Sequence, residues 1–245
     1  MQRLEGFLSG QCGLSRKQWK ERIRAGRVTC NGAPVLDPAR QIDPARDTIC
    51  IDSEALTCPQ RVVLLLHKPA GYLTATQDRQ DKTVMDLLTG VHTRIYPVGR
   101  LDRDSEGLLL LTNDGALAQR LTHPSHEISK TYQVTVQGDT DGAAERLAAM
   151  RSLEGEPIAP VRVRVVRQEE GRALLELTLR QGKNRQIRRM CAQCGLTVLR
   201  LRRIREDCLT LGSLKAGTWR DLTPEEVSAL KGETSKSAKG LRPGR

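Results

Sequence analysis

The clearest pattern along the chain is alternation of apolar and polar positions in several segments of its second half. In residues 130–138, KTYQVTVQG, one side carries Tyr132, Val134 and Val136 and the other carries Thr131, Gln133 and Thr135. A period of two is typical of a strand with one buried face. PVRVRVV alternates in the same way, and ALLELTL predicts a further strand.

Two other segments are continuously apolar. The run VVLLL precedes Lys68, and GLLLLTN follows an acidic stretch at residues 102–106. Such runs predict strands that are buried on both faces. A further strand is expected around RIYPVG and a short helix at TVMDLL.

Helices are predicted from capping residues and from apolar stripes. Ser15 and Gln18 form a capping box for LSRKQWKERIRAG, and Thr223 and Glu226 form another for LTPEEVSAL. DGALAQRLTHP is expected to be helical. In GKNRQIRRMCAQCG, a stripe at helical spacing contains Ile187, Met190, Cys191 and Cys194.

These elements suggest two domains. After the first capped helix, Asn31-Gly32 predicts a hairpin turn, and DTICID predicts a closing strand. The periodicity breaks near ALTCPQ, so we predict a first domain at residues 1–56 and a second at 61–231, followed by a loose basic tail at 232–245. Because strands outnumber helices and are often adjacent, the larger domain should be α+β with a mixed, largely antiparallel sheet.

The charge of the chain points to a polyanionic partner. The 245 residues carry a formal charge of +11, which suits nucleic acid or an anionic membrane surface. The longest apolar runs are about a quarter of the ~20 residues that a membrane-spanning helix needs. The first residues have no secretion pattern, so we expect a cytoplasmic protein that does not bind a membrane.

The positive charge is concentrated in two segments. Residues 16–27 carry six bases and one acid, and residues 180–205 carry nine bases and no acid. Segments with many bases and almost no acids favour contacts with RNA phosphates over a merely solvated surface. The predicted RNA contacts in these segments are Arg16, Lys17, Lys20, Arg24, Lys183, Arg185 and Arg189.

Metal binding is not favoured by the sequence. The chain has seven cysteines but only one CxxC pair, Cys191 and Cys194, and that pair is explained by the apolar stripe. The alternation of Asp102, Asp104 and Glu106 imitates a calcium loop, but the twelfth position is Asn113, where a bidentate glutamate is required. No second acidic cluster completes a two-metal site. Asp104 and Glu106 are therefore expected to lie exposed in a turn.

Residues 97–115, PVGRLDRDSEGLLLLTNDG, resemble the active-site motif of pseudouridine synthases, in particular the RsuA-like family that modifies bacterial ribosomal RNA. Further family motifs follow the expected order: LHKPAGYLTA, SKTYQVTV, GKNRQIRRM and LGSLKAGTWRDLTPEE. Residues 1–56 resemble the alpha-L RNA-binding domain. That match includes Ser15-Arg16, Ile23, Gly26, Val28, Asn31-Gly32 and Val35, and Glu5-Gly6 departs from the pattern.

The resemblance implies that the chain isomerises uridine to pseudouridine without a cofactor or a metal. It implies that Asp102 is the catalytic carboxylate, attacking C1′ or removing the 2′ proton. Arg188 would hold Asp102 ionised through a charge-assisted pair. Tyr132 would stack on the uracil and assist loss of the C5 proton, and Arg100 would fill the space of the flipped nucleotide. Lys68 and Pro69 would shape the neighbouring loop.

Two alternatives remain at this point. One is a non-catalytic RNA-binding ribosome-assembly protein on the same fold, which would not need Asp102, Tyr132 and Arg188 together. The other is a metal-dependent phosphoesterase. The expected partner is ribosomal RNA or an assembly intermediate, with the subunit and the target uridine undetermined and a monomer as the default.

Overall fold

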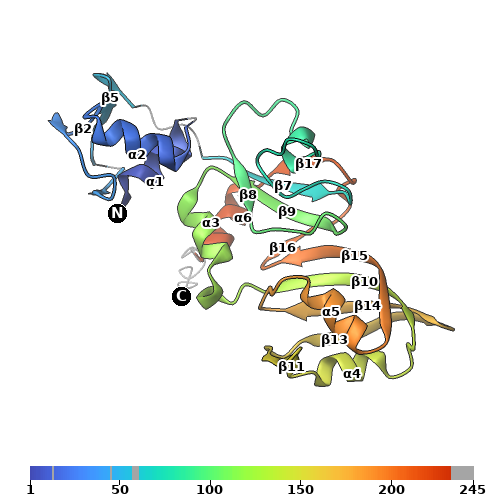
Figure 1. Ribbon diagram of the computed structural model, residues 1–245. Helices are drawn as coiled ribbons and strands as arrows, with labels where there is room; N and C mark the ends of the chain where they lie inside the picture. The colour runs from blue at the N-terminus through green and yellow to red at the C-terminus, as the bar shows by residue number, and fades with distance from the viewer. Residues whose placement is uncertain (13, 45, 57–60, 233–245) are drawn as a thin grey trace, which may run out of the picture. The chain divides into compact units, whose positions relative to one another are not determined.

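The computed structural model describes residues 1–12, 14–44, 46–56 and 61–232. The predicted tail, apart from Gly232, and most of the predicted linker lie outside these residues. The chain forms two compact units (Figure 1). Of the described residues, the first unit contains those within 1–62, 90–96 and 112–116, and the second contains those within 63–89, 97–111 and 117–232. Among the described residues, no helix is long and apolar enough to cross a membrane.

The first unit packs two helices against short strands. They are α1 (Leu4–Gln11), α2 (Arg16–Arg24), β1 (Gln2–Arg3), β2 (Val28–Cys30), β3 (Ala33–Pro34), β4 (Gln41–Ile42), β5 (Ile49–Ile51) and β6 (Glu54–Ala55). β1 pairs with β4, and the other strands form a sheet in the order β3-β2-β5-β6. The Ser15 capping box is confirmed. The hairpin turn is confirmed as well, because Asn31 and Gly32 both have positive φ, at 53° and 80°.

Segments 90–96 and 112–116 belong to the first unit, where they contact Leu14 and Val62. Thr112 Oγ1 donates to the Val62 carbonyl at 2.6 Å, and the Val62 amide donates to Asn113 Oδ1 at 2.9 Å. Arg94 donates to the Leu14 carbonyl. A boundary drawn along the sequence does not anticipate these two segments, because they are inserted between strands of the second unit.

The second unit is built on a nine-stranded sheet. Its strands are β7 (Val63–Lys68), β8 (Tyr96–Val98), β9 (Glu106–Thr112), β10 (Lys130–Gly138), β13 (Arg162–Glu169), β14 (Arg172–Leu179), β15 (Leu196–Glu206), β16 (Leu209–Thr210) and β17 (Trp219–Asp221). The order is β13-β14-β10-β15-β9-β7-β17, with β16 on β15 and β8 on β9. β15 and β9 are parallel, whereas β10 is antiparallel to β14 and β15. This pairing agrees with the predicted mixed sheet.

Helices and short segments complete the second unit. They are η1 (Val84–Leu87), α3 (Gly115–Thr122), η2 (Pro124–His126), α4 (Ala143–Ala149), β11 (Ser152–Leu153), β12 (Glu156–Pro157), α5 (Gln186–Gln193) and α6 (Pro224–Lys231). The helix predicted at TVMDLL is a single 3₁₀ turn. The capping box of α6 is confirmed. The stripe of α5 is buried at Ile187, Met190 and Cys191, and Cys194 is partly exposed.

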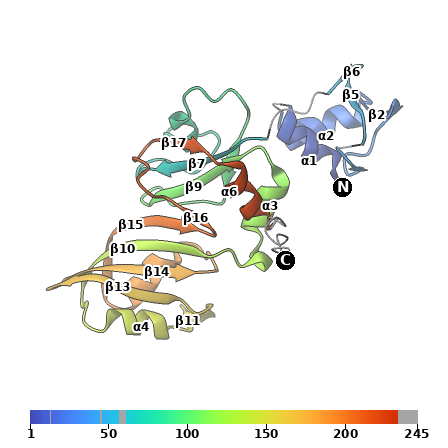
Figure 2. The same ribbon diagram turned by 180° about the vertical axis from the view of Figure 1, so that it is seen from behind.

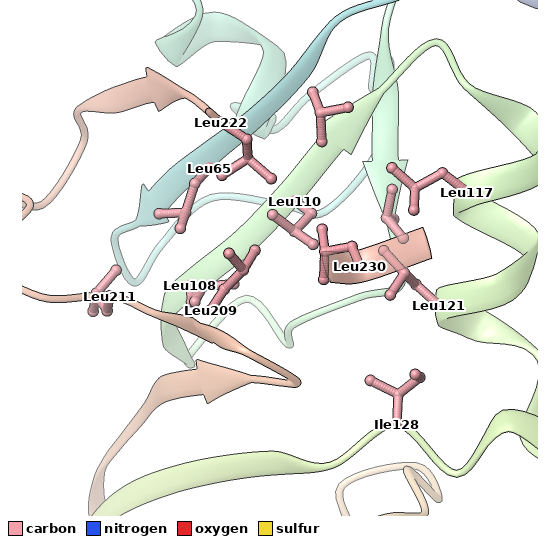
Figure 3. Packing of buried hydrophobic residues seen from close by; sticks show 12 residues of the cluster. Leu65, Leu108, Leu110, Leu117, Leu121, Ile128, Leu209, Leu211, Leu222 and Leu230 are labelled. Atoms are coloured by element: carbon pink, nitrogen blue, oxygen red, sulfur yellow. The ribbon is translucent and has the colours of Figure 1, made fainter. Parts of the chain in front are cut away.

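One core of the second unit lies between β7, β9, α3 and α6. Figure 3 shows Leu65 of β7 beside Leu108 and Leu110 of β9, with Leu121 of α3 and Leu230 of α6 pointing toward them. All of β7 and most of β9 are buried on both faces, as the continuous apolar runs predict. β9 therefore gives a rigid base to the turn that precedes it.

Candidate active site

The turn between β8 and β9 carries the predicted catalytic residue. Gly99 has a φ of +73°, which an L-residue rarely adopts, and the Ser105 amide donates to the Asp102 carbonyl at 3.1 Å. Leu101 is buried, whereas the Asp102 side chain remains 33% exposed. The turn thus presents a carboxylate next to a buried backbone.

Lys68, the last residue of β7, holds this turn from beneath. Its side chain is fully buried, and its Nζ donates to the backbone carbonyls of Asp102 at 3.0 Å and Ser105 at 2.7 Å. The carbonyls of Pro69 and Arg103 lie within 3.4 Å of the same nitrogen. Burial lowers the pKa of Lys68 to about 8, although the nearby carboxylates oppose this shift. These contacts support the expectation that Lys68 shapes the neighbouring loop.

Residues that follow β7 hold the turn from another side. Thr74 Oγ1 donates to the Leu101 carbonyl at 2.6 Å and accepts from the Leu101 amide at 3.2 Å. The Gly71 amide donates to the Arg103 carbonyl at 2.7 Å, and the Arg103 side chain pairs with Asp81 at 2.9 Å. The position of Asp102 is therefore fixed through both of its sequence neighbours.

A pocket of about 320 Å³ opens beside Asp102. Its apolar lining comes from Leu101, Tyr132, Leu179, Ile187 and Leu201. Its polar lining comes from Arg100, Asp102, Ser105, Lys183, Asn184, Arg185 and Gln186. A cleft of this size that combines apolar side chains with polar and charged groups is typical of a small-ligand site, and a single nucleotide base is a suitable occupant.

The cation nearest Asp102 differs from the predicted one. Arg185 Nη1 lies 3.6 Å from Asp102 Oδ2, and the same guanidinium binds both carboxylate oxygens of Asp104. Arg188 instead donates to the Asp104 carbonyl at 3.0 Å and lies 3.3 Å from Asp104 Oδ2. The predicted Arg188–Asp102 pair is therefore wrong in this structure. Arg185, which adopts a left-handed φ of 46° at the N-cap of α5, reaches further toward Asp102.

Asp104 and Glu106 both form ion pairs with arginines. Hydrogen bonding from Arg185, with a further contribution from the Arg188 charge, lowers the pKa of Asp104. The Glu106 side chain is only 15% exposed, and it pairs with Arg200 at 2.6 Å. The expectation that both acids lie exposed is therefore wrong for Glu106. Their arginine partners lie about 80 to 94 positions away along the chain. These ion pairs therefore could not be predicted from neighbouring residues in the sequence.

Tyr132 lies in the wall of the pocket, and a buried charge cluster lies next to it. Arg203, its cross-strand neighbour, donates from Nε to the Leu108 carbonyl at 2.7 Å and pairs with Glu206 at 3.3 Å. Lys130 lies 3.7 Å from Glu206. Burial raises the pKa of Tyr132, and Arg203 acts in the opposite direction. This cluster was not predicted from the sequence, because Lys130 on β10 and Arg203 and Glu206 on β15 are brought together only by strand pairing.

The other predicted RNA contacts fall into two groups. In the second unit, Arg100 and Lys183 line the pocket, and Arg189 binds Glu154 with two short contacts. In the first unit, Arg16, Lys17 and Arg24 are exposed on α2, whereas Lys20 lies 3.5 Å from Glu5. Within the described ranges, no group of three or more His, Cys, Asp or Glu side chains is placed to hold a metal ion.

Comparisons with known proteins identify the family. Residues 62–193 match the model of the RNA pseudouridylate synthase family. The chain is 36% identical to the ribosomal large subunit pseudouridine synthase B of Bacillus subtilis, over 94% of this chain and 96% of that protein. It is 35% identical to an uncharacterized RNA pseudouridine synthase of Aquifex aeolicus, over 93% of each chain. A crystal structure of a pseudouridylate synthase superposes with a TM-score of 0.65 at 31% identity, over 94% of this chain and 100% of that one.

The chain therefore belongs to the RNA pseudouridylate synthase family. It is an isomerase that converts uridine to pseudouridine in RNA.

Proposed function

We propose that this chain modifies a uridine of ribosomal RNA in the manner of RsuA-like enzymes, with Asp102 as the catalytic carboxylate. The observation that carries the proposal is the position of Asp102 at a pocket lined by Tyr132, in a turn held by the buried Lys68. Ribosomal RNA as the substrate is supported by the name of the Bacillus subtilis relative.

The chemistry rearranges bonds and leaves the overall composition of the uridine unchanged. The N1–C1′ bond breaks, uracil turns within the pocket, and C5 bonds to C1′. The proton on C5 then leaves, and N1 carries a proton in the product. Asp102 acts on the ribose, either by attacking C1′ or by removing the 2′ proton. Both roles use a carboxylate oxygen, and the Arg185 guanidinium lies 3.6 Å from Oδ2 of this carboxylate.

Tyr132 supplies the surface on which uracil stacks. Its ring lies in the pocket wall, and its raised pKa keeps the hydroxyl protonated. A protonated phenol donates a hydrogen bond and is a poor base. We therefore assign Tyr132 to stacking and orientation of the base, and we expect its hydroxyl to assist the loss of the C5 proton only by donating a hydrogen bond.

We assign different roles to the three arginines around the turn. Arg185 lies beside Asp102, and Arg188 fixes the backbone and side chain of Asp104. Arg188 thus acts on the catalytic residue through the turn. Arg100 is exposed at the pocket and occupies the space that the flipped nucleotide leaves in the RNA. Flipping costs a few kcal/mol, which binding by the basic surfaces offsets.

We also propose that residues 1–56 act as an alpha-L RNA-binding domain. The exposed bases of α2, Arg16, Lys17 and Arg24, supply sequence-independent contacts with phosphates. The reaction requires no cofactor in this proposal, since it involves neither redox change nor group transfer.

Release of a label from uridine C5 tests the proposal. Transcribed ribosomal RNA labelled at C5 is incubated with the protein in the presence of EDTA. We expect release with the wild type and none with Asp102→Asn. Release that disappears only on chelation would favour metal-dependent chemistry instead. No release from ribosomal RNA or from assembly particles would contradict the proposed substrate.

A further inference from the structure

The basic segment 180–205 does not form one surface. Successive residues of a strand point to opposite faces of a sheet. On β10 and β15, Tyr132 and Leu201 line the pocket beside Asp102. Their neighbours Gln133 and Arg202 line a separate hollow of about 290 Å³. The arginines of β15 that point with Arg202 therefore lie on the face of the sheet opposite to the active site.

That opposite face carries six arginines on β13 and β15, the strands that flank β14 and β10. β13 contributes Arg162, Arg164 and Arg167, and β15 contributes Arg200, Arg202 and Arg205. We call this set the arginine face. The residues lie in three rows across β13, β14, β10 and β15. The rows are Arg162-Thr178-Thr131-Arg205, Arg164-Glu176-Gln133-Arg202 and Arg167-Leu174-Thr135-Arg200.

The arginine face is open to solvent. Figure 2 shows no helix across β10 and β14 on this side, whereas α5 packs against β15 with Ile187 directed to the pocket of the other face. The side chains of Arg164, Arg167 and Arg200 are 67%, 75% and 61% exposed. An exposed sheet face of one dominant charge suits an anionic partner.

The charge of the arginine face is only partly neutralised. Arg164 pairs with Glu176, Arg167 pairs with Glu169, and Glu106 lies within 4.0 Å of both Arg200 and Arg202. Arg162 and Arg205, at the two ends of the first row, have no carboxylate within salt-bridge distance among the described residues. Six arginines against three glutamates give a net charge of +3, and the exposed Arg172 of β14, in register with Glu169, adds one further positive charge to the same face.

The spacing of the arginines fits two lines of phosphates. Three steps between neighbouring strands separate the β13 line from the β15 line, which amounts to roughly 14–15 Å. The strip between the lines carries Thr178, Gln133 and Thr135, all partly exposed, together with Leu174 and with Glu176, which is paired with Arg164. Thr131 is buried beneath the strip and shares a hydrogen bond with Thr178. Double-helical RNA offers two phosphate strands on either side of a shallow minor groove lined with 2′-hydroxyls, and proteins recognise it largely through this shape.

We propose that the arginine face binds a double-helical segment of the RNA substrate, outside the nucleotide that enters the active site. This inference rests on the proposed action of the enzyme on structured RNA. The β13 and β15 arginines contact the two phosphate strands, and Thr178, Gln133 and Thr135 face the 2′-hydroxyls between them. The face raises affinity for structured RNA without contacting the reacting uridine.

A triple variant tests the proposal. Arg162, Arg167 and Arg205 are changed to glutamine, which spares the pairs of Glu106 and Glu176. The matched control replaces three bases with glutamine: Arg79, Arg151 and Lys215. All three are exposed, belong to the same unit and lie outside the arginine face. Binding to RNA duplex, to DNA duplex of the same sequence and to single-stranded RNA is measured over a range of salt concentrations. Label release is measured on a minimal single-stranded RNA and on a long structured RNA.

We expect the triple variant to lose about tenfold in affinity for RNA duplex and to reduce the salt slope by about 2 to 3, with the control unchanged. Binding to single-stranded RNA and label release from the minimal RNA should remain at the wild-type level. Equal duplex binding by the triple variant and the wild type would overturn the proposal. It would also be overturned if binding to DNA duplex or to single-stranded RNA fell as much as binding to RNA duplex, because the face would then not recognise the shape of double-helical RNA. Absence of label release with wild-type protein would contradict the proposed function and leave the duplex measurement valid.

Discussion

The turn around Asp102 and the helix α2 both carry charges to which we assign a function, but their surroundings differ. In the turn, the Asp102 carbonyl is held by Lys68, Leu101 is held by Thr74, and the carboxylates lie beside two arginines. On α2, Arg16, Lys17 and Arg24 are exposed to solvent. The contrast matches their tasks. Catalysis requires one carboxylate at a fixed position, whereas contacts with phosphates tolerate side chains that adapt to the RNA.

Replacement of Lys68 by methionine should have the largest effect on the turn. The change leaves carbonyl groups without their donor and removes the cation from a site near three carboxylates. We expect the free energy of unfolding to fall by about 3–5 kcal/mol. Label release should fall by at least about a hundredfold in protein that is still folded.

Denaturant unfolding and single-turnover label release measure the two effects of Lys68→Met. Lys82→Met is the control, because Lys82 is exposed in the loop after β7. A Lys68 variant with wild-type turnover would show that Asp102 does not depend on the buried ammonium.

Loss of the Thr74 hydroxyl should affect the reaction step more than binding. Thr74→Val keeps the shape of the side chain but removes both hydrogen bonds to Leu101. We expect kcat to fall about tenfold, with KM for RNA almost unchanged and activity restored in Thr74→Ser. A rise in KM at constant kcat would place Thr74 in RNA binding instead.

Replacement of the exposed bases of α2 should lower the affinity for RNA and leave kcat unchanged. In the variant Arg16→Gln, Lys17→Gln, Arg24→Gln, we expect affinity for ribosomal RNA to fall about tenfold and the salt slope to shrink by about 2 to 3. The value of kcat at saturating RNA should stay the same. Glutamine at the exposed Arg40 and Arg46 serves as the control in the same unit. A lower kcat in the α2 variant would remove the distinction between the two regions.

The lowered pKa of Lys68 gives the smallest predicted effect. The folded protein releases this proton near pH 8, whereas an ordinary lysine releases it near 10.5. The unfolded state therefore binds more protons within this window, so the contribution of Lys68 to stability rises with pH. We expect the difference in unfolding free energy between wild type and Lys68→Met to grow by about 1 kcal/mol per pH unit from pH 8 to 10. A difference independent of pH would place the pKa of Lys68 at its ordinary value.

Elements with strong local signals could be predicted from the sequence. The capping boxes at Ser15 and Thr223 and the turn at Asn31-Gly32 were predicted correctly, because each depends on residues a few positions apart. The helix α4 and the short strands β11 and β12 were not predicted. Residues 143–149 contain mostly small apolar residues and give no clear stripe.

The arrangement of charges in the site could be predicted only in part. The motif placed Asp102 in the turn and Tyr132 on a strand, and the structure brings both to one pocket. The prediction that Arg188 is the cation near Asp102 was wrong, because the approach of Arg185 depends on the left-handed backbone at that residue. Likewise, strand pairing decides which bases of residues 180–205 lie on each face of the sheet. A count of bases along the sequence cannot predict this.

Two carboxylates of the same turn give the most direct test of the central claim. Asp102 lies at the pocket, whereas Asp104 holds Arg185 and Arg188. Label release from C5-labelled ribosomal RNA is measured in single turnover for Asp102→Asn and Asp104→Asn. Asp102→Asn should abolish release while RNA binding persists, and Asp104→Asn should slow it by about tenfold. Release by Asp102→Asn at a rate similar to that of Asp104→Asn would contradict the assignment of Asp102 as the catalytic residue.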